Sequence, residues 1–501
     1  MQLMAKKITA AIMALVLLVT SFSGCSILES EEETTEETTT ETTTTETVIP
    51  NDDTTFKLSY TQSDSLNPFE ATTQNNQIVC QLVFESLFDV DDNYKATLNI
   101  ASDYEYTGTK TLKVTIAEDL EFSNGEAVTA AKVKSSFDSA KDSDYWSGTL
   151  DGISSCTVED SNTVVFKLAY ANPYAHNLLT FPIVWGEDDD GYAVGSGRYY
   201  FAKEDGETVL KAYVTSSFSP KITTIHLENI TSLESIDNAV NIGNISFAFR
   251  DLSEGSSTKI SANKKLVNMN NLVYLGLNTE SGICKNTYIR KAISLAVDRS
   301  VLVESAYGSF AQVATGLFNP QFELSDTELF DSEANTTAAE QAIEQSGRSS
   351  LSISILVNKG NSDRVACAKL IKQQLEDVGF TVTITSVSYS KYKKKIKKGN
   401  YDIYIGEVKI TNDMSLYNFL DEDGSTNWGI DTDGDTATAY AEYMSGEAEL
   451  GTFLLAYADE MPYIPLLYRK GMVCFSKAMN GDVQSTWHDV FKNIENWYFT
   501  T

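Results

Sequence analysis

Histidine is scarce in this sequence, which holds only three: His176, His226 and His488. Since histidine is the commonest metal ligand and a frequent general base, little material remains for a centre built from several of them. The sequence also lacks the GxSxG, HExxH and Walker motifs that mark hydrolases, zinc proteases and NTPases. We therefore expect no metal and no cofactor. A secreted hydrolase with paired carboxylates is the enzyme alternative, but no base and nucleophile can be named for it.

Basic residues are also few, because 38 Lys and Arg stand against 70 Asp and Glu, for a net charge of −32. A nucleic-acid binder needs Lys and Arg to neutralise phosphates, so we expect no nucleic-acid partner. The same balance argues against docking on anionic lipid by charge. The 25 Tyr, 23 Phe and 5 Trp are too many for a disordered chain, and 501 residues suffice for two or three domains.

Long apolar runs are missing from the sequence except near its start. Lys6 and Lys7 precede a nearly unbroken apolar run from 8 to 20, which is short for a membrane span but typical of a secretory signal. Ser-Gly before Cys25 resembles a bacterial lipobox, in which the Cys becomes the lipidated first residue. We expect residues 1–24 to be a lipoprotein signal peptide; an ordinary signal peptide with an incidental Cys is the alternative.

Residues 29–47 hold eight Glu, ten Thr, one Ser and no basic residue. Such a segment has nothing to bury and repels itself, so it favours an extended chain. We expect 25–54 to be a disordered tether that holds the folded body away from the lipid.

Five further cysteines form no CxxC pair, so no redox or zinc motif is indicated. In an exported protein one disulfide remains open, although the sequence does not identify its partners. These cysteines are Cys80, Cys156, Cys284, Cys367 and Cys474.

Two stretches of the body differ in pattern. In the first, alternation predicts strands at 56–60, 104–106, 112–116 and 163–168, and apolar spacing predicts a helix at 77–88. Thr129 is a good N-cap for a further helix over 130–140.

In the second stretch the elements alternate. We expect strands at 351–357, 380–387 and 401–405, with helices at 362–378, ended by Gly379, and at 389–398. This β-α-β-α-β order indicates a parallel sheet. Two α/β bodies in one chain suggest a cleft between them, where small ligands usually bind. The lysines of 391–398 are read as a solvated helix face.

Five motifs in order resemble the family 5 extracellular solute-binding proteins, the receptors of ABC importers for oligopeptides, dipeptides and nickel. They cover roughly residues 56–485. The motifs are the strand, Asn-Gly turn and helix start of 112–133, Gly195-Ser-Gly-Arg-Tyr-Tyr-Phe201, Ile289-Arg-Lys-Ala-Ile-Ser-Leu-Ala-Val-Asp-Arg299 with Tyr307-Gly308, the segment 368–402, and Met461-Pro-Tyr-Ile-Pro-Leu-Leu467.

The resemblance implies an α/β, two-lobed periplasmic-binding-protein-like fold (type II, cluster C-like) with a hinge and an interlobe cleft. The first lobe, split into two subdomains, would span 55–268, the second lobe 269–455, and a C-terminal return to the first lobe 456–501. The chain would be an exported, lipid-anchored monomer, on the outer face of the cytoplasmic membrane or facing the periplasm. Its partners would be a small ligand, most often a short peptide, and an ABC permease with its ATPase.

The resemblance also implies an acidic clamp for the ammonium group of a peptide soon after the strand at 401–405. Ile410 stands where the first acid is expected, and Asp413 falls near the second acidic position, with Glu407 as a substitute. We name Asp413 as a candidate ligand residue; a turn-capping role is its alternative.

Other candidates are residues near expected loops that offer flat apolar faces or polar tips, although each aromatic could instead belong to a core or its rim. They are Asn67, Phe69, Trp146, Trp185, Tyr417 and Trp428. Sugars, metal chelates and other metabolites remain open as ligands, and a surface sensor or chaperone remains open as a function, because fold does not settle function.

Overall fold

A mixed eleven-stranded sheet runs through the computed structural model, which describes residues 55–252, 259–325 and 328–499. Residues Asn51–Thr501 form one unit of the chain, to which the sheet belongs. In spatial order its strands are β15 (Thr381–Val387), β14 (Ser352–Asn358), β16 (Ile403–Lys409), β12 (Asn263–Leu277), β17 (Tyr463–Phe475), β11 (Phe247–Arg250), β1 (Phe56–Tyr60), β10 (Thr224–Asn229), β9 (Glu207–Ala212) and β8 (Tyr199–Glu204), with β13 (Ala311–Val313) paired to β17.

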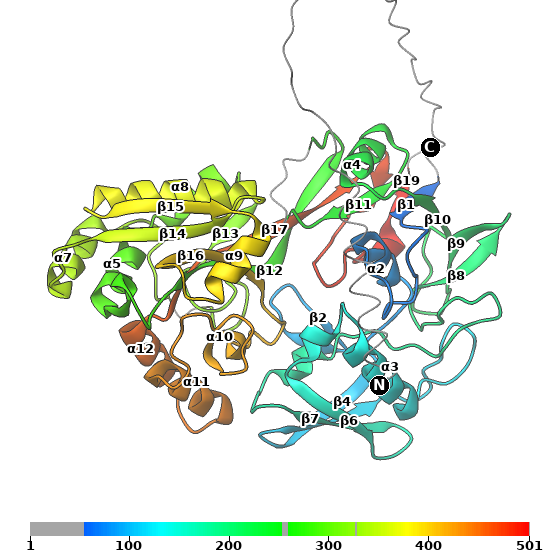
Figure 1. Ribbon diagram of the computed structural model, residues 1–501. Coiled ribbons are helices and arrows are strands. Elements are labelled where there is room, and N and C mark those ends of the chain that lie inside the picture. The colour runs from blue at the N-terminus through cyan, green and yellow to red at the C-terminus, as the bar shows by residue number, and fades with distance from the viewer. Residues whose placement is uncertain (1–54, 253–258, 326–327, 500–501) are drawn as a thin grey trace, which may run out of the picture. The chain divides into compact units, whose positions relative to one another are not determined.

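The second lobe contains the expected parallel β-α-β-α-β unit, which is confirmed: β14 pairs in parallel with both β15 and β16. Helices α8 (Ser362–Asp377) and α9 (Tyr389–Ile396) connect these strands (Figure 1). The side chain of Asn361 caps α8 by accepting from the backbone N–H of Arg364 at 2.9 Å. Gly379 follows the helix with φ of 98°, as expected of a residue in the left-handed region.

Two long strands, β12 and β17, pair antiparallel and extend from the second lobe into the first (Figure 1). β12 is continuous across residues 268 and 269, where the sequence placed the change of lobe. Its register with β17 shifts between Asn268 and Leu272. Such a bulge bends a strand locally, so the connection between the lobes is itself part of the sheet.

The first lobe has two large hydrophobic cores, and a smaller cluster beside them that includes Ile236 and Val240. One packs under β1, β8 and β10, and includes Phe56, Tyr199 and Phe247. The other lies between helix α3 (Ala130–Asp142) and an antiparallel four-stranded sheet, and includes Phe137 and Phe166. The strands of that sheet are β4 (Ala101–Gly108), β5 (Thr111–Ile116), β7 (Thr163–Leu168) and β6 (Ile153–Val158). With one further large core in the second lobe, the two-lobed α/β fold with a divided first lobe is confirmed.

Eleven α-helices lie in the described ranges, and the side chain of Thr129 caps α3 as expected by accepting from Lys132 N–H. Their bounds are α2 (Gln74–Cys80), α3 (Ala130–Asp142), α4 (Leu233–Ile242), α5 (Thr287–Ala296), α6 (Arg299–Val301), α7 (Thr336–Ser346), α8, α9, α10 (Tyr417–Leu420), α11 (Asp435–Ser445) and α12 (Leu450–Glu460). In the described part of the chain, no helix has the length and apolar character needed to cross a membrane.

The helix expected at 77–88 is wrong over most of its length, because α2 ends at Cys80. The carbonyl oxygens of Leu82 and Val83 leave the helical pattern and accept the backbone N–H groups of Tyr199 and Gly197, both at 2.9 Å. Residues 88–90 then form strand β2, paired with β3 (Ala96–Leu98). The apolar residues of this segment therefore do not form one helix face; the segment pairs instead with residues 197–199 and with β3.

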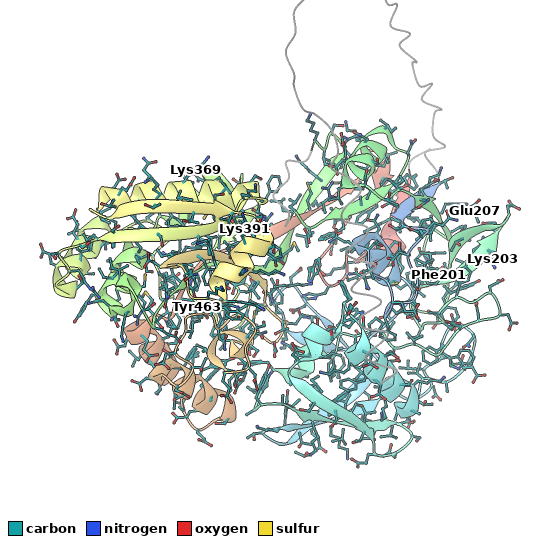
Figure 2. All side chains as sticks on the ribbon, viewed as in Figure 1. Phe201, Lys203, Glu207, Lys369, Lys391 and Tyr463 are labelled. Atoms are coloured by element: carbon teal, nitrogen blue, oxygen red, sulfur yellow. The ribbon has the colours of Figure 1, made fainter. Side chains whose placement is uncertain are left out.

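The C-terminal segment packs on the first lobe. The ring of Trp497, which is fully buried, lies 5.3 Å from that of Phe247 and 6.3 Å from that of Phe56. β18 (Met479–Asn480) and β19 (Tyr498–Phe499) pair beside it. All five cysteines beyond residue 54 are buried free thiols; Cys25 and the expected signal and tether lie outside the described residues. Figure 2 shows the side chains of Phe201, Lys203 and Glu207 on the β8–β9 hairpin.

Candidate functional site

A cavity of about 840 Å³ lies between segments that are far apart in the sequence. Its first-lobe wall comes from α2 and the residues after it, from β2, and from residues 145–151. Its second-lobe wall comes from the end of β16 and residues 410–412, and residues 486–489 of the C-terminal segment close it. The volume is within the range of small-ligand sites.

Two carboxylates of the first-lobe wall are held by one amide. The Nδ2 atom of Asn99 donates to Glu85 Oε2 at 2.6 Å and to Asp89 Oδ1 at 3.1 Å. Desolvation by the surrounding protein and the neighbouring charges of Glu85 and Asp489 raise the pKa of Asp89 to about 7, and desolvation likewise raises the pKa of Glu85. Both groups are therefore sensitive to any positive charge that enters the cavity.

Arg198 and Asp489 form a two-armed ion pair beside these carboxylates. Nη2 and Nη1 of Arg198 lie 2.7 and 3.2 Å from the two oxygens of Asp489, and Nη1 also donates to the carbonyl of Phe491 at 3.0 Å. Burial opposes the charge of Arg198, but Asp489, Glu85 and Asp89 outweigh burial and raise its pKa. The pair ties the C-terminal segment to the first lobe, a geometry suited to a guanidinium fork.

The second-lobe wall carries Lys409, the last residue of β16. Its ammonium nitrogen lies 3.7 Å from the centre of the Trp487 ring, a cation–π contact. The side chain is exposed to the space of the cavity, but the surrounding protein lowers the pKa of its ammonium group to about 8, with Asp251 opposing the shift.

His488 follows Trp487 along the wall and packs edge-on against Tyr94, with ring centres 5.4 Å apart. Burial, and then the charge of Lys409, lower its pKa to about 3, so the imidazole is neutral at physiological pH. Its Nε2 atom is buried and has no hydrogen-bond partner among the described residues. The neutral ring can accept or donate one hydrogen bond here.

Trp146 is the candidate from the sequence that lines the cavity, and its Nε1 donates to the carbonyl of Pro68 at 3.1 Å. Asn67 and Phe69 do not line it. Asn67 Oδ1 accepts the backbone N–H of Phe69 in a local turn, and the Phe69 ring packs against the core of the four-stranded sheet.

Trp185 and Trp428 do not line the cavity either, and each ring has a lysine beside it. Lys132 lies 5.0 Å from the ring of Trp185, and Lys397 lies 5.7 Å from that of Trp428. Each indole is half-buried against a core, as the alternative interpretation of these residues stated.

Asp413 and Tyr417 join the two lobes instead of lining the cavity. Asp413 is buried, and its oxygens accept from Asn172 of the first lobe at 2.6 Å and from Thr411 at 2.5 Å. Tyr417 packs against Tyr170 of the first lobe, with ring centres 3.7 Å apart. Glu407, the substitute clamp, is buried beside Arg364 and Arg469 in the second lobe.

Sequence reasoning missed the charged residues of the cavity. One signal was available: Arg198 is the charged residue inside the Gly195–Phe201 motif, and it is the residue that pairs with Asp489. Glu85, Asp89 and Lys409 carry no motif, because the cavity assembles from segments about four hundred residues apart in the chain.

The chain matches the model of the bacterial extracellular solute-binding proteins, family 5 Middle, over residues 95–429, and it belongs to that family. Members of the family are transport receptors and not enzymes, so this chain is a substrate-binding protein of the ABC importer class.

Relatives are distant in sequence. The glutathione-binding protein GsiB of Salmonella paratyphi A is 22% identical over 346 residues, covering 64% of this chain and 67% of GsiB. The oligopeptide-binding protein AppA of Bacillus subtilis is 20% identical over 486 residues, covering 86% of this chain and 89% of AppA. Among solved structures, a putative peptide-binding protein AppA from Clostridium difficile superposes with a TM-score of 0.68 at 17% identity, covering 89% of this chain and all of that one. The superposition shows a shared fold.

Proposed function

We propose that this chain is the lipid-anchored receptor of an ABC importer and that it binds a short peptide between its lobes. The observation that carries the proposal is the cavity of about 840 Å³, which residues of both lobes line. Its lining includes aromatic rings and charged side chains of both signs. Such a lining suits a small ligand that has polar ends and an apolar body. The names of GsiB and AppA, a glutathione and an oligopeptide receptor, support a peptide ligand.

A ligand bound across the cavity would change the relative populations of the arrangements of the two lobes. A ligand that touches both lobes favours the arrangement in which both walls contact it, and this difference in affinity shifts the population. The permease then has a ligand-dependent shape to recognise. A monomer would suffice for this mechanism, because residues of both lobes of one chain supply the two walls of the cavity.

Ligand-linked stabilisation tests the proposal. We expect pools of di- to pentapeptides to raise the Tm, because a ligand at 100 times its Kd stabilises the folded state by about 2.7 kcal/mol. Differential scanning fluorimetry provides the measurement, with pools of sugars and nickel–histidine as the matched comparison. Mass spectrometry of ligand released from the purified protein provides an independent identification. A shift with sugars alone would contradict the peptide assignment.

The anchor is tested separately. We expect Cys25→Ser to move the protein from the membrane fraction to the medium or periplasm, because one residue carries the acyl chains that hold it. Labelling with radioactive palmitate, followed by cell fractionation, provides the measurement, and Cys80→Ser is the control because Cys80 is buried in the body. Label on the Cys25→Ser protein would contradict lipidation at this position. A tethered receptor stays near its permease at high effective concentration.

A further inference from the structure

The charged residues of the cavity are divided unequally between its walls. The first lobe and the C-terminal segment contribute every carboxylate among the lining residues, and the second lobe contributes a single charged residue, Lys409. The carboxylates are Glu85, Asp89, Asp91, Asp151 and Asp489. A ligand that spans the cavity therefore meets negative charge on one side and positive charge on the other.

Lys409 is the lining cation that is free to take a ligand. Arg198 is engaged by Asp489, and Lys492 lies 3.7 Å from a carboxylate oxygen of Asp92. Lys409 makes no ion pair with any residue in the described ranges, and its contact is the face of Trp487. Its ammonium group keeps its hydrogen-bond donors for an anion.

The Glu85–Asp89 pair has free carboxylate oxygens that can accept hydrogen bonds from a ligand cation. Asn99 uses one oxygen of each carboxylate, and the other two, Glu85 Oε1 and Asp89 Oδ2, have no hydrogen-bond partner among the described residues. The charge of Glu85 raises the pKa of Asp89, and the nearby Arg198 offsets this effect only in part, so a further cation beside the pair would be favourable. An ammonium group has three donors and can satisfy both free oxygens at once.

We propose, building on the peptide-binding function above, that the cavity binds a zwitterionic ligand with its ammonium group on Glu85 and Asp89 and its carboxylate on Lys409. This polarity is opposite to the second-lobe ammonium clamp that the resemblance implied. Ile410 stands at the clamp position, and the neighbouring residue on the cavity wall is a cation. The two ends of the ligand then connect the two lobes.

Blocked peptides test the carboxylate end. Trialanine, N-acetyl-trialanine and trialanine amide are titrated by isothermal calorimetry into the wild type and Lys409→Gln. We expect the substitution to weaken trialanine about tenfold and to leave trialanine amide unchanged, because the amide has no charge for Lys409 to hold. Lys391→Gln is the matched control, since Lys391 is exposed on α9 and does not line the cavity (Figure 2).

Asp89→Asn tests the ammonium end, where the pH dependence is informative. Asp89 faces the carboxylates of Glu85 and Asp489, the guanidinium of Arg198 and the amide of Asn99. Since its pKa is about 7, the charge that holds an ammonium group is lost as the pH falls. We expect trialanine to bind the wild type roughly tenfold more weakly at pH 6 than at pH 7.5, and this dependence to flatten in Asp89→Asn. The α-ammonium group of trialanine, with a pKa of about 8, and Lys409, also about 8, are both more fully charged at pH 6 than at pH 7.5. Their titration would strengthen binding at pH 6, so a loss of affinity there points to Asp89.

The outcomes separate the two proposals. If Lys409→Gln weakens trialanine and its amide equally, or weakens neither, the assigned polarity is wrong although peptide binding stands. The polarity is also wrong if N-acetyl-trialanine binds the wild type as well as trialanine does. A wild type that binds neither trialanine nor the peptide pools overturns the proposed function itself. Glu118→Gln, an exposed turn residue outside the cavity, is the control for loss of a carboxylate, and circular dichroism checks that each variant is folded.

Discussion

Trp497→Ala is expected to lower the free energy of unfolding by about 4 kcal/mol. The indole is fully buried and packs against Phe56 of β1, Phe247 of β11 and Phe491, so its removal leaves a cavity among rings that cannot collapse into it. It also removes the hydrogen bond from Nε1 to Asn493 Oδ1, 2.9 Å long. The midpoint of urea denaturation, followed by circular dichroism, measures the change.

Tyr498→Ala is the control for the neighbouring position. Tyr498 is 37% exposed, and its ring contact is with Lys221, so its loss should cost less than about 1 kcal/mol. If Trp497→Ala unfolds within 1 kcal/mol of the wild type, the C-terminal segment is not part of the first-lobe core. The comparison of the two substitutions thus tests whether the C-terminal segment packs into the core of the first lobe.

Local signals predicted the second lobe well. The strands at 352–358 and 381–387 and the helix between them fall within one residue of the expected bounds, because alternation, a cap and Gly379 all point the same way. Where several local signals agree, tertiary contacts rarely change the type or the bounds of an element.

The first lobe shows where such signals fail. Residues 81–88 have helix-like spacing, yet the backbone of Leu82 and Val83 pairs with the Gly197 loop. A partner more than a hundred residues away overrides the local preference.

The candidate site was predicted less well than the fold. The presence of an aromatic residue in the sequence predicts burial but not the surface against which the ring packs. Trp185 and Trp428 lie beside lysines, and Tyr417 packs against the opposite lobe, instead of lining the cavity. The charged residues that do line it are ordinary in sequence. What singles them out is that Glu85 and Asp489 contribute to the same wall, and this follows only from the folded chain.

Gly197→Ala is expected to destabilise the first lobe by about 3 kcal/mol, for a reason that the motif alone does not reveal. A Cβ at this position would lie 2.5 Å from the carbonyl carbon of Val83 and 2.7 Å from the carbonyl oxygens of Leu82 and Val83. These are backbone atoms held by the hydrogen bonds from Gly197 and Tyr199, so they have no rotamer by which to move away. The midpoint of urea denaturation again provides the measurement.

Gly451→Ala provides the matched control, because it is the same substitution at a glycine whose added Cβ meets no clash. Gly451 lies in α12, and outside its chain neighbours and the backbone of its own helix no atom comes within 4 Å of its would-be Cβ. Alanine there should therefore be neutral or stabilise the helix by up to about 1 kcal/mol. Arg198 follows Gly197 directly and reaches the cavity wall, so a shifted loop would also displace the ion pair with Asp489 and weaken ligand binding. A Gly197→Ala protein as stable as the wild type would mean that the loop can move away from Leu82 and Val83. The cavity wall would then lack the rigid support that its ion pair requires.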